Sequence, residues 1–147
     1  MARIEMGYPT RGAELERLSA RGAANPLASL QPVTDGATLT RLAAGSGEVR
    51  VARAVKEYSV DIVDATRSSS DLRLGASPRA GLQLLRAVRV RAAVTGRDYV
   101  IPDDVQALLA SVLSHRVLLT SAARLAGRSG ADAVTAAAAT VALPRSI

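Results

Sequence analysis

A serine, a proline and an arginine stand together at positions 77–79, and this order is the part of the sequence best suited to binding chemistry. Ser77 is a favoured N-cap residue and Pro78 suits the first helical position, so Arg79 falls in the first turn of a predicted helix. The unpaired backbone N–H groups of that turn, together with a guanidinium, suit a phosphate group. The alternative is a solvated Arg79 that tolerates roughly a few tenths of a kcal/mol of repulsion from the helix dipole. Spacing alone favours the solvated side chain.

Other motifs point away from a complete active site. The glycine-rich stretches at 45–47 and 127–130 lack the following Lys and Ser/Thr that a phosphate-binding P-loop requires. His115 has no acidic partner indicated by spacing and is expected to cap the C-terminus of a helix. Asp103 and Asp104 are expected to supply negative charge to a helix N-terminus rather than to bind a metal. We therefore predict neither a self-contained catalytic site nor a metal site.

The composition favours packed helices. Of the 147 residues, 48% are hydrophobic but only 2% are aromatic, so Leu, Val, Ile and Ala must build the core. The absence of Cys excludes disulfides and thiolate chemistry. No run of about 20 apolar residues and no signal peptide is evident, which makes the cytoplasm the expected location.

The charge balance permits a nucleic acid or an acidic partner without requiring one. The formal net charge is +6, and all basic residues except Lys56 are arginines. These arginines are dispersed along helical segments, and no aromatic side chains interleave with them to stack on bases. Binding to nucleic acid is therefore the minority interpretation.

Apolar residues recur at helical spacing through most of the chain. Around 51–65 they fall on one narrow face, and two further stripes follow within 77–95 and 102–113. The helix predicted over 77–95 should have an outer side that faces away from the core. We expect this side to carry Arg79, Arg86 and Arg97. The stripes comprise Val51, Val55, Tyr58, Ile62 and Ala65, then Leu84, Leu85, Val88 and Ala92, then Val105, Leu108, Leu109, Val112 and Leu113.

These patterns predict a mainly all-α fold, in which four or five helices after the linker form a small bundle. Alternating residues at 3–8 predict one short strand whose sheet is not in this chain. A linker is expected over 22–32, a loop over 67–76, and an extended or helical return over 116–119. The predicted helices are 10–21, 35–44, about 51–65, 77–95, 102–113 and a short one near 131–139.

Several of these segments, taken together, resemble one known family. In order and spacing they are similar to the C-terminal part of MoxR-type AAA+ ATPases, over 3–9 and roughly 33–120. The segments are Arg3 to Pro9 (RIEMGYP), Tyr58 to Arg67 (YSVDIVDATR), Gly75 to Ala80 (GASPRA), Gly96 to Val105 (GRDYVIPDDV) and Ser114 to Val117 (SHRV).

The resemblance implies a division of the chain and a role for the arginine. It implies the end of an ATPase core and a linker over 1–32, a helical lid over 33–120, and a C-terminal tail over 121–147. Arg79 matches the sensor 2 arginine, which reaches the γ-phosphate and couples hydrolysis to lid movement, with Ser77 and Pro78 beside the nucleotide. The P-loop and Walker B residues of the family would precede this chain, so alone it is not expected to hydrolyse ATP or to bind ATP and Mg²⁺ tightly.

The resemblance also implies partners. These are the ATPase core, neighbouring subunits of a ring, and proteins with von Willebrand factor A domains, in chaperone-like remodelling or maturation of other proteins. A stand-alone basic helical module that binds nucleic acid, or an adaptor, is the alternative. The family usually has Thr or Ser where Ile101 stands, a loss of a helix cap worth about 1 kcal/mol.

Overall fold

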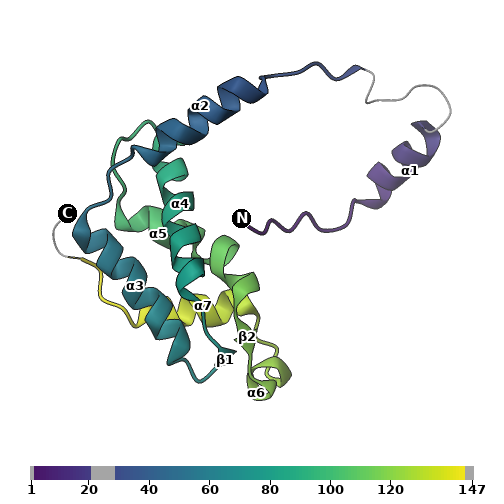
Figure 1. Ribbon diagram of the computed structural model, residues 1–147. Coiled ribbons are helices and arrows are strands. Elements are labelled where there is room, and N and C mark those ends of the chain that lie inside the picture. The colour runs from purple at the N-terminus through teal and green to yellow at the C-terminus, as the bar shows by residue number, and fades with distance from the viewer. Residues whose placement is uncertain (1, 21–28, 145–147) are drawn as a thin grey trace.

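The computed structural model describes residues 2–20 and 29–144, and its architecture is a helical bundle (Figure 1). The helices α3, α4, α5 and α7 pack around one core, α2 lies against α4, and α1 follows an N-terminal segment that is exposed to solvent. The elements are α1 (Arg11–Ala20), α2 (Gly36–Gly47), α3 (Arg53–Arg67), β1 (Leu72–Leu74), α4 (Pro78–Val94), α5 (Pro102–Leu113), the 3-10 turn η2 (Ser114–Arg116), β2 (Leu118–Leu119), α6 (Ser121–Leu125) and α7 (Gly130–Ala139).

The mainly all-α prediction is confirmed, and the helix starts obey the expected capping. Asp35 accepts the Thr38 N–H at 2.7 Å to begin α2, and Thr10 does the same for Ala13 at the start of α1. Gly96 adopts a φ of 76° just after α4, as a C′ glycine should. The predicted linker lies largely outside the described residues, as does Arg21, the expected end of the first helix.

Three details differ from the predictions. Residues 3–8 form no strand, because no described segment pairs with them in a ladder; the Arg3 N–H instead donates to the Ser111 carbonyl at 2.7 Å. The helix α2 runs through its glycines to Gly47. The loop over 67–76 contains β1, which pairs antiparallel with β2. The extended or helical return predicted over 116–119 is confirmed, since η2 ends at Arg116 and β2 follows at Leu118–Leu119.

The core is almost entirely aliphatic, as the composition requires. All three predicted stripes face it, although Val51, Leu85 and Leu108 lie at its edge and the half-buried Ala65 is not part of it. Tyr58 is its aromatic member, and the Tyr58 hydroxyl accepts a hydrogen bond from Gln106 Nε2 on α5 at 3.2 Å. The division of the chain at residue 120 stays a prediction. In the structure α7 extends the core beyond that point with Ala133, Val134, Ala137 and Ala138.

A buried carboxylate joins the end of α4 to the start of α5. The Asp104 side chain is 2% exposed and accepts two hydrogen bonds from Arg97, at 2.7 and 2.8 Å. It also lies 3.3 Å from Arg91 Nε and accepts the Ile101 N–H at 3.0 Å. Arg97 is therefore turned inward, and the prediction that it shares the outer side of α4 with Arg79 is wrong. Asp104 thereby caps the Ile101 backbone N–H, whereas the apolar Ile101 side chain caps none of the N–H groups of the first turn.

Replacing this carboxylate is expected to weaken the fold. In Asp104→Asn the Arg97 and Arg91 guanidinium groups lose their buried counter-charge, and the free energy of unfolding should fall by about 2 kcal/mol. Urea denaturation followed by far-ultraviolet circular dichroism measures the change. Asp98→Asn is the matched control, because the ion pair between Asp98 and Arg50 is exposed and should contribute less than about 1 kcal/mol. Equal losses in the two variants would contradict a special role for the buried group.

The same pair predicts a pH dependence. Hydrogen bonds from Arg97 lower the pKa of the Asp104 carboxyl, against the opposing effect of burial. A carboxyl whose pKa is lowered by folding stabilises the protein above its ordinary pKa, and this contribution is lost as the pH falls through the lowered value. The stability difference between wild type and Asp104→Asn should therefore be full at pH 7 and shrink below about pH 4. A constant difference down to pH 2 would contradict this assignment.

Candidate functional site at the start of helix α4

The first turn of α4 presents an arginine without a partner. Ser77 caps the helix by accepting the Ala80 N–H at 3.3 Å, and Pro78 occupies the first turn, as predicted. The Arg79 side chain is exposed, and it forms no hydrogen bond or ion pair with any residue that the structure describes. Among the described residues, then, the guanidinium is solvated and free to meet an anion.

The segment that leads into α4 crosses very close to the end of α3. A Cβ atom on Gly75 would lie 2.6 Å from both Cα and N of Arg67, and 2.7 Å from the carbonyl carbon of Thr66. Such distances cannot be accommodated without moving one backbone relative to the other. Glycine is therefore required at position 75 for the two segments to cross at this separation.

Both backbone groups of the next residue are held by side chains of α3. The Ala76 N–H donates to Thr66 Oγ1 at 2.9 Å, while the Ala76 carbonyl accepts from Arg67 Nε at 3.0 Å. The Thr66 hydroxyl donates in turn to the Val63 carbonyl at 2.6 Å, so it is satisfied in both directions. Because Thr66 and Ala76 are buried, the two bonds of the Thr66 hydroxyl are shielded from water, whereas the bond from Arg67 is only partly buried. They set the place at which α4 begins and so the position of Arg79.

An apolar groove reaches the first turn of α4 at Pro78. It has a volume of about 310 Å³ and lies between α3 and α4, with Pro78 of the first turn of α4 in its wall. Gly81 faces Val63 here, and a Cβ at this position would lie 3.4 Å from the Val63 side chain, which is an ordinary van der Waals contact. The lining residues are Ser59, Val60, Val63, Arg67, Pro78, Gly81, Leu82 and Leu85.

The remaining candidate residues do not assemble into a second site. Arg86 is exposed on the outer side of α4, as predicted. His115 lies exposed in η2, without a hydrogen bond to another described residue. Slight burial, then the positive charges of Arg116 and Arg3, lower its pKa. Among the described residues there is no group of three acidic or histidine side chains that could hold a metal ion.

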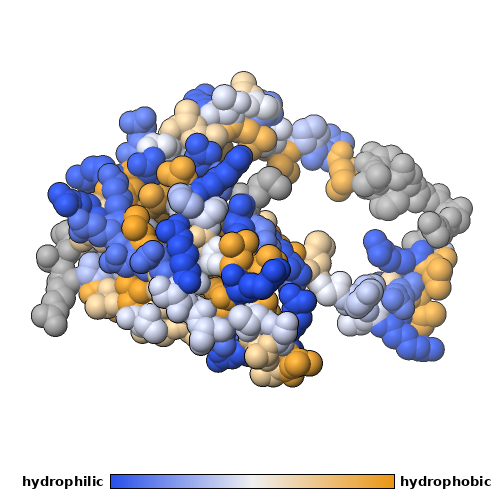
Figure 2. Space-filling view, turned by 60° about the horizontal axis from the view of Figure 1, so that its bottom comes forward, coloured by the Kyte–Doolittle hydropathy of each residue, from blue (hydrophilic) through white to orange (hydrophobic). Residues whose placement is uncertain are grey.

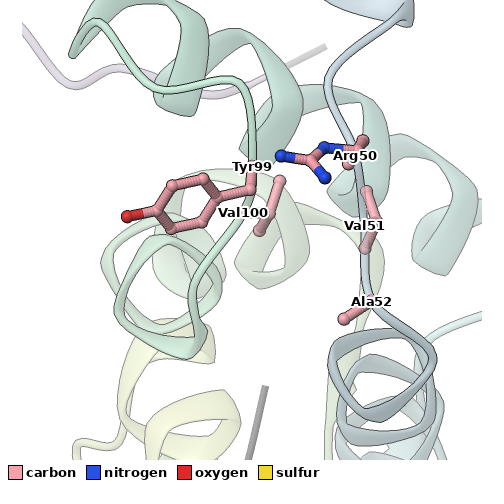
Figure 3. A pocket seen from close by; sticks show the side chains of 5 residues that line it. All are labelled: Arg50, Val51, Ala52, Tyr99 and Val100. Carbon is pink, nitrogen blue, oxygen red and sulfur yellow. The ribbon is translucent and has the colours of Figure 1, made fainter.

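A second hollow is larger but chemically poorer. It measures about 640 Å³ and lies beside the β-bridge between Arg50 and Tyr99. In this bridge the Arg50 N–H donates to the Asp98 carbonyl at 2.8 Å, and the Val100 N–H donates to the Arg50 carbonyl at 3.0 Å. Figure 3 shows the Tyr99 ring directed away from the segment that carries Arg50 and Ala52. The Arg50 side chain is the charged group in its lining and already pairs with Asp98. The start of α4 is therefore the stronger candidate.

The family model that describes the AAA lid domain matches residues 64–137. The chain belongs to this family. The match runs from the end of α3 to α7. The residues matched by the family model therefore include Thr66, Gly75, Arg79 and Asp104. None of its described helices is long and apolar enough to cross a lipid bilayer.

Curated relatives confirm the predicted resemblance to MoxR proteins. The chain is 36% identical over 152 residues to Chaperone MoxR1 of Mycobacterium tuberculosis, and the alignment covers 97% of this chain and 40% of that protein. It is 38% identical over 125 residues to the YeaC protein of Bacillus subtilis, covering 85% of this chain and 39% of the relative. The chain thus spans about two fifths of the length of these relatives.

A solved structure shares the fold. A protein of Cytophaga hutchinsonii, provisionally described as an ATPase, superposes with a TM-score of 0.81 at 24% identity. The superposition covers 97% of this chain and 46% of the other. The helical lid architecture is therefore one already known from a crystal structure.

The close crossing at Gly75 makes a direct prediction. Gly75→Ala should lower the free energy of unfolding by about 2 kcal/mol, because the added Cβ forces the 75–77 segment away from α3. Gly45→Ala is the control: it adds the same methyl group to an exposed helical glycine that has no neighbour within 4 Å, and stability should stay unchanged or rise by up to about 1 kcal/mol. Urea denaturation compares them, and a Gly75→Ala protein as stable as wild type would contradict the predicted clash.

The threonine at the end of α3 makes a second prediction. Thr66→Val keeps the shape of the side chain but leaves the buried Ala76 N–H unpaired, at a cost of about 1–3 kcal/mol. Amide hydrogen exchange should show faster exchange at Ala76 and in the first turn of α4. Thr40→Val is the control, because Thr40 on α2 bonds only the Gly36 carbonyl at an exposed position. Unaltered exchange around Ala76 would show that the hydroxyl does not hold this segment.

Proposed function

We propose that this AAA lid domain acts in a MoxR-type ATPase as the part that senses bound nucleotide, with Arg79 contacting the γ-phosphate. The observation that carries the proposal is the exposed Arg79 guanidinium, which has no partner among the described residues and stands in a first turn whose place is set by the bonds to the Ala76 backbone. An arginine that pairs with none of the described side chains is ready to bind an external anion. Its planar, permanently charged group suits the oxygens of a phosphate.

The surroundings of Arg79 fit a nucleotide better than a metal. Ser77 and Pro78 stand beside the arginine at the helix start, and the apolar groove that begins at Pro78 offers a surface for a flat, weakly polar base. The described residues offer no cluster of metal ligands, and the contribution proposed for Arg79 is a contact with the phosphate. A cation placed near the γ-phosphate stabilises the negative charge that spreads over its oxygens during transfer.

The packing also supports a coupling role. Because α3 and the start of α4 are joined through Ala76, a force on Arg79 acts on both helices together. Loss of the γ-phosphate would release that contact and let the lid move as a unit. The relative from Mycobacterium tuberculosis is named a chaperone, and we extend to this chain a role in remodelling partner proteins within a ring of subunits, in the cytoplasm.

A chimera tests the role of the arginine. This chain replaces the aligned region of Chaperone MoxR1, and ATP turnover is compared between the chimera and its Arg79→Ala variant. Turnover should fall at least about tenfold, since charge stabilisation of phosphoryl transfer by an arginine is commonly worth more than that. Nucleotide affinity is measured in parallel by fluorescence titration.

Arg86→Ala provides the matched control, because Arg86 is an exposed arginine two turns further along the same side of α4. It should leave turnover unchanged. Unchanged turnover and unchanged affinity in Arg79→Ala would remove this residue from the mechanism.

A further inference from the structure

One end of the molecule is formed by three short elements. β1 and β2 pair with Leu74 opposite Leu118, and the Thr120 N–H donates to the Asp71 carbonyl at 2.9 Å. An ion pair between Arg128 and Asp71 ties the segment after α6 back to β1. Figure 1 shows the three elements together at the lower end of the bundle. We refer to them as the β1–β2–α6 surface.

This surface carries apolar side chains that nothing in the described chain covers. The exposed fractions are 57% for Leu74, 42% for Leu118 and 90% for Leu125. Figure 2, which brings the bottom of the molecule forward, shows hydrophobic residues set among hydrophilic ones on this face. Exposed leucines gathered on segments that the fold brings together are typical of a contact surface rather than of a solvated edge.

The charge on the same surface is one-sided. Residues 71–74 and 118–128, which hold the three elements, contain three arginines and one acidic residue, which gives 3 − 1 = +2 of the formal net charge of +6 for the whole chain. The one acid, Asp71, is already paired with Arg128. Arg73 and Arg124 are exposed and form no hydrogen bond or ion pair with a described residue. The surface therefore combines unneutralised guanidinium groups with bare leucines.

We propose that the β1–β2–α6 surface binds an acidic, amphipathic segment of a partner protein. Apolar side chains of that segment would cover Leu74, Leu118 and Leu125, and its carboxylates would meet Arg73 and Arg124. A nucleic acid fits less well, because the surface has no aromatic side chain on which a base could stack and its leucines would stay bare. This goes beyond the nucleotide role of Arg79 and does not depend on it.

Peptide binding to the full chain tests the proposal. The probe is a fluorescein-labelled helical peptide of about 18 residues, five turns, with leucines on one face and glutamates on the other. Fluorescence anisotropy should detect binding that weakens as salt is added. A matched peptide with lysine in place of each glutamate should bind at least about tenfold more weakly, because like charges then oppose one another.

Variants locate the binding site. The double variant Arg124→Glu and Leu125→Glu changes two exposed side chains of α6 and should weaken binding of the glutamate peptide at least about tenfold, while Arg73→Glu on β1 should weaken it independently. The control carries Leu39→Glu and Arg41→Glu on α2, the same exchanges at exposed positions on another element. It should bind as wild type does. Far-ultraviolet circular dichroism confirms that each variant is folded.

Three outcomes would overturn the proposal. One is no binding of the glutamate peptide by the wild-type chain, and another is an equal loss in the α2 control. The third is that single-stranded DNA of similar length binds more tightly than the peptide and is weakened by the same β1 and α6 variants. The binding assay contains no nucleotide, so none of these outcomes tests the role of Arg79. That role is tested separately by ATP turnover in the chimera.

Discussion

The arrangement of this domain depends on how the backbone of Ala76 is held against the end of α3. An extended residue between a strand and a helix would normally expose its N–H and carbonyl groups to water. Here the Thr66 hydroxyl and the Arg67 guanidinium bind both groups, and Gly75 permits the close approach that these bonds need. The strand β1 and the helix α4 then leave this point in fixed directions. The position of every outward-facing residue at this end of the bundle follows from that one crossing.

The helix α4 is held at both ends, by chemically different contacts. At its start, side chains of α3 bond the Ala76 backbone, whereas at its other end Arg91 and Arg97 converge on the buried carboxylate of Asp104. Between these two points the aliphatic side of α4 packs into the core. A helix fixed in this way moves together with its neighbours. This rigidity suits the proposed contact between Arg79 and a ligand outside the chain.

Local pattern was enough to predict the helices and the candidate arginine. Capping residues and apolar spacing identified α3, α4, α5 and α7, and the order of Ser77, Pro78 and Arg79 gave the first turn of α4. What holds that turn could not be predicted, because Thr66 lies ten residues away from Ala76 and its hydroxyl looks like any other in a helix. The inward turn of Arg97 was missed for a similar reason. Helical spacing places it on the outer side of α4, but the helix ends before it and the backbone changes direction at Gly96.

The lack of large aromatic residues has a spectroscopic consequence. The sequence contains three tyrosines and neither phenylalanine nor tryptophan, and of the three only Tyr58 is buried. Its hydroxyl is hydrogen-bonded to Gln106, so the ring reports on the contact between α3 and α5. Tyr8 and Tyr99 are exposed and contribute a nearly constant background. The near-ultraviolet signal of this protein is therefore a built-in probe of one helix–helix contact in its core, obtained without introducing a label.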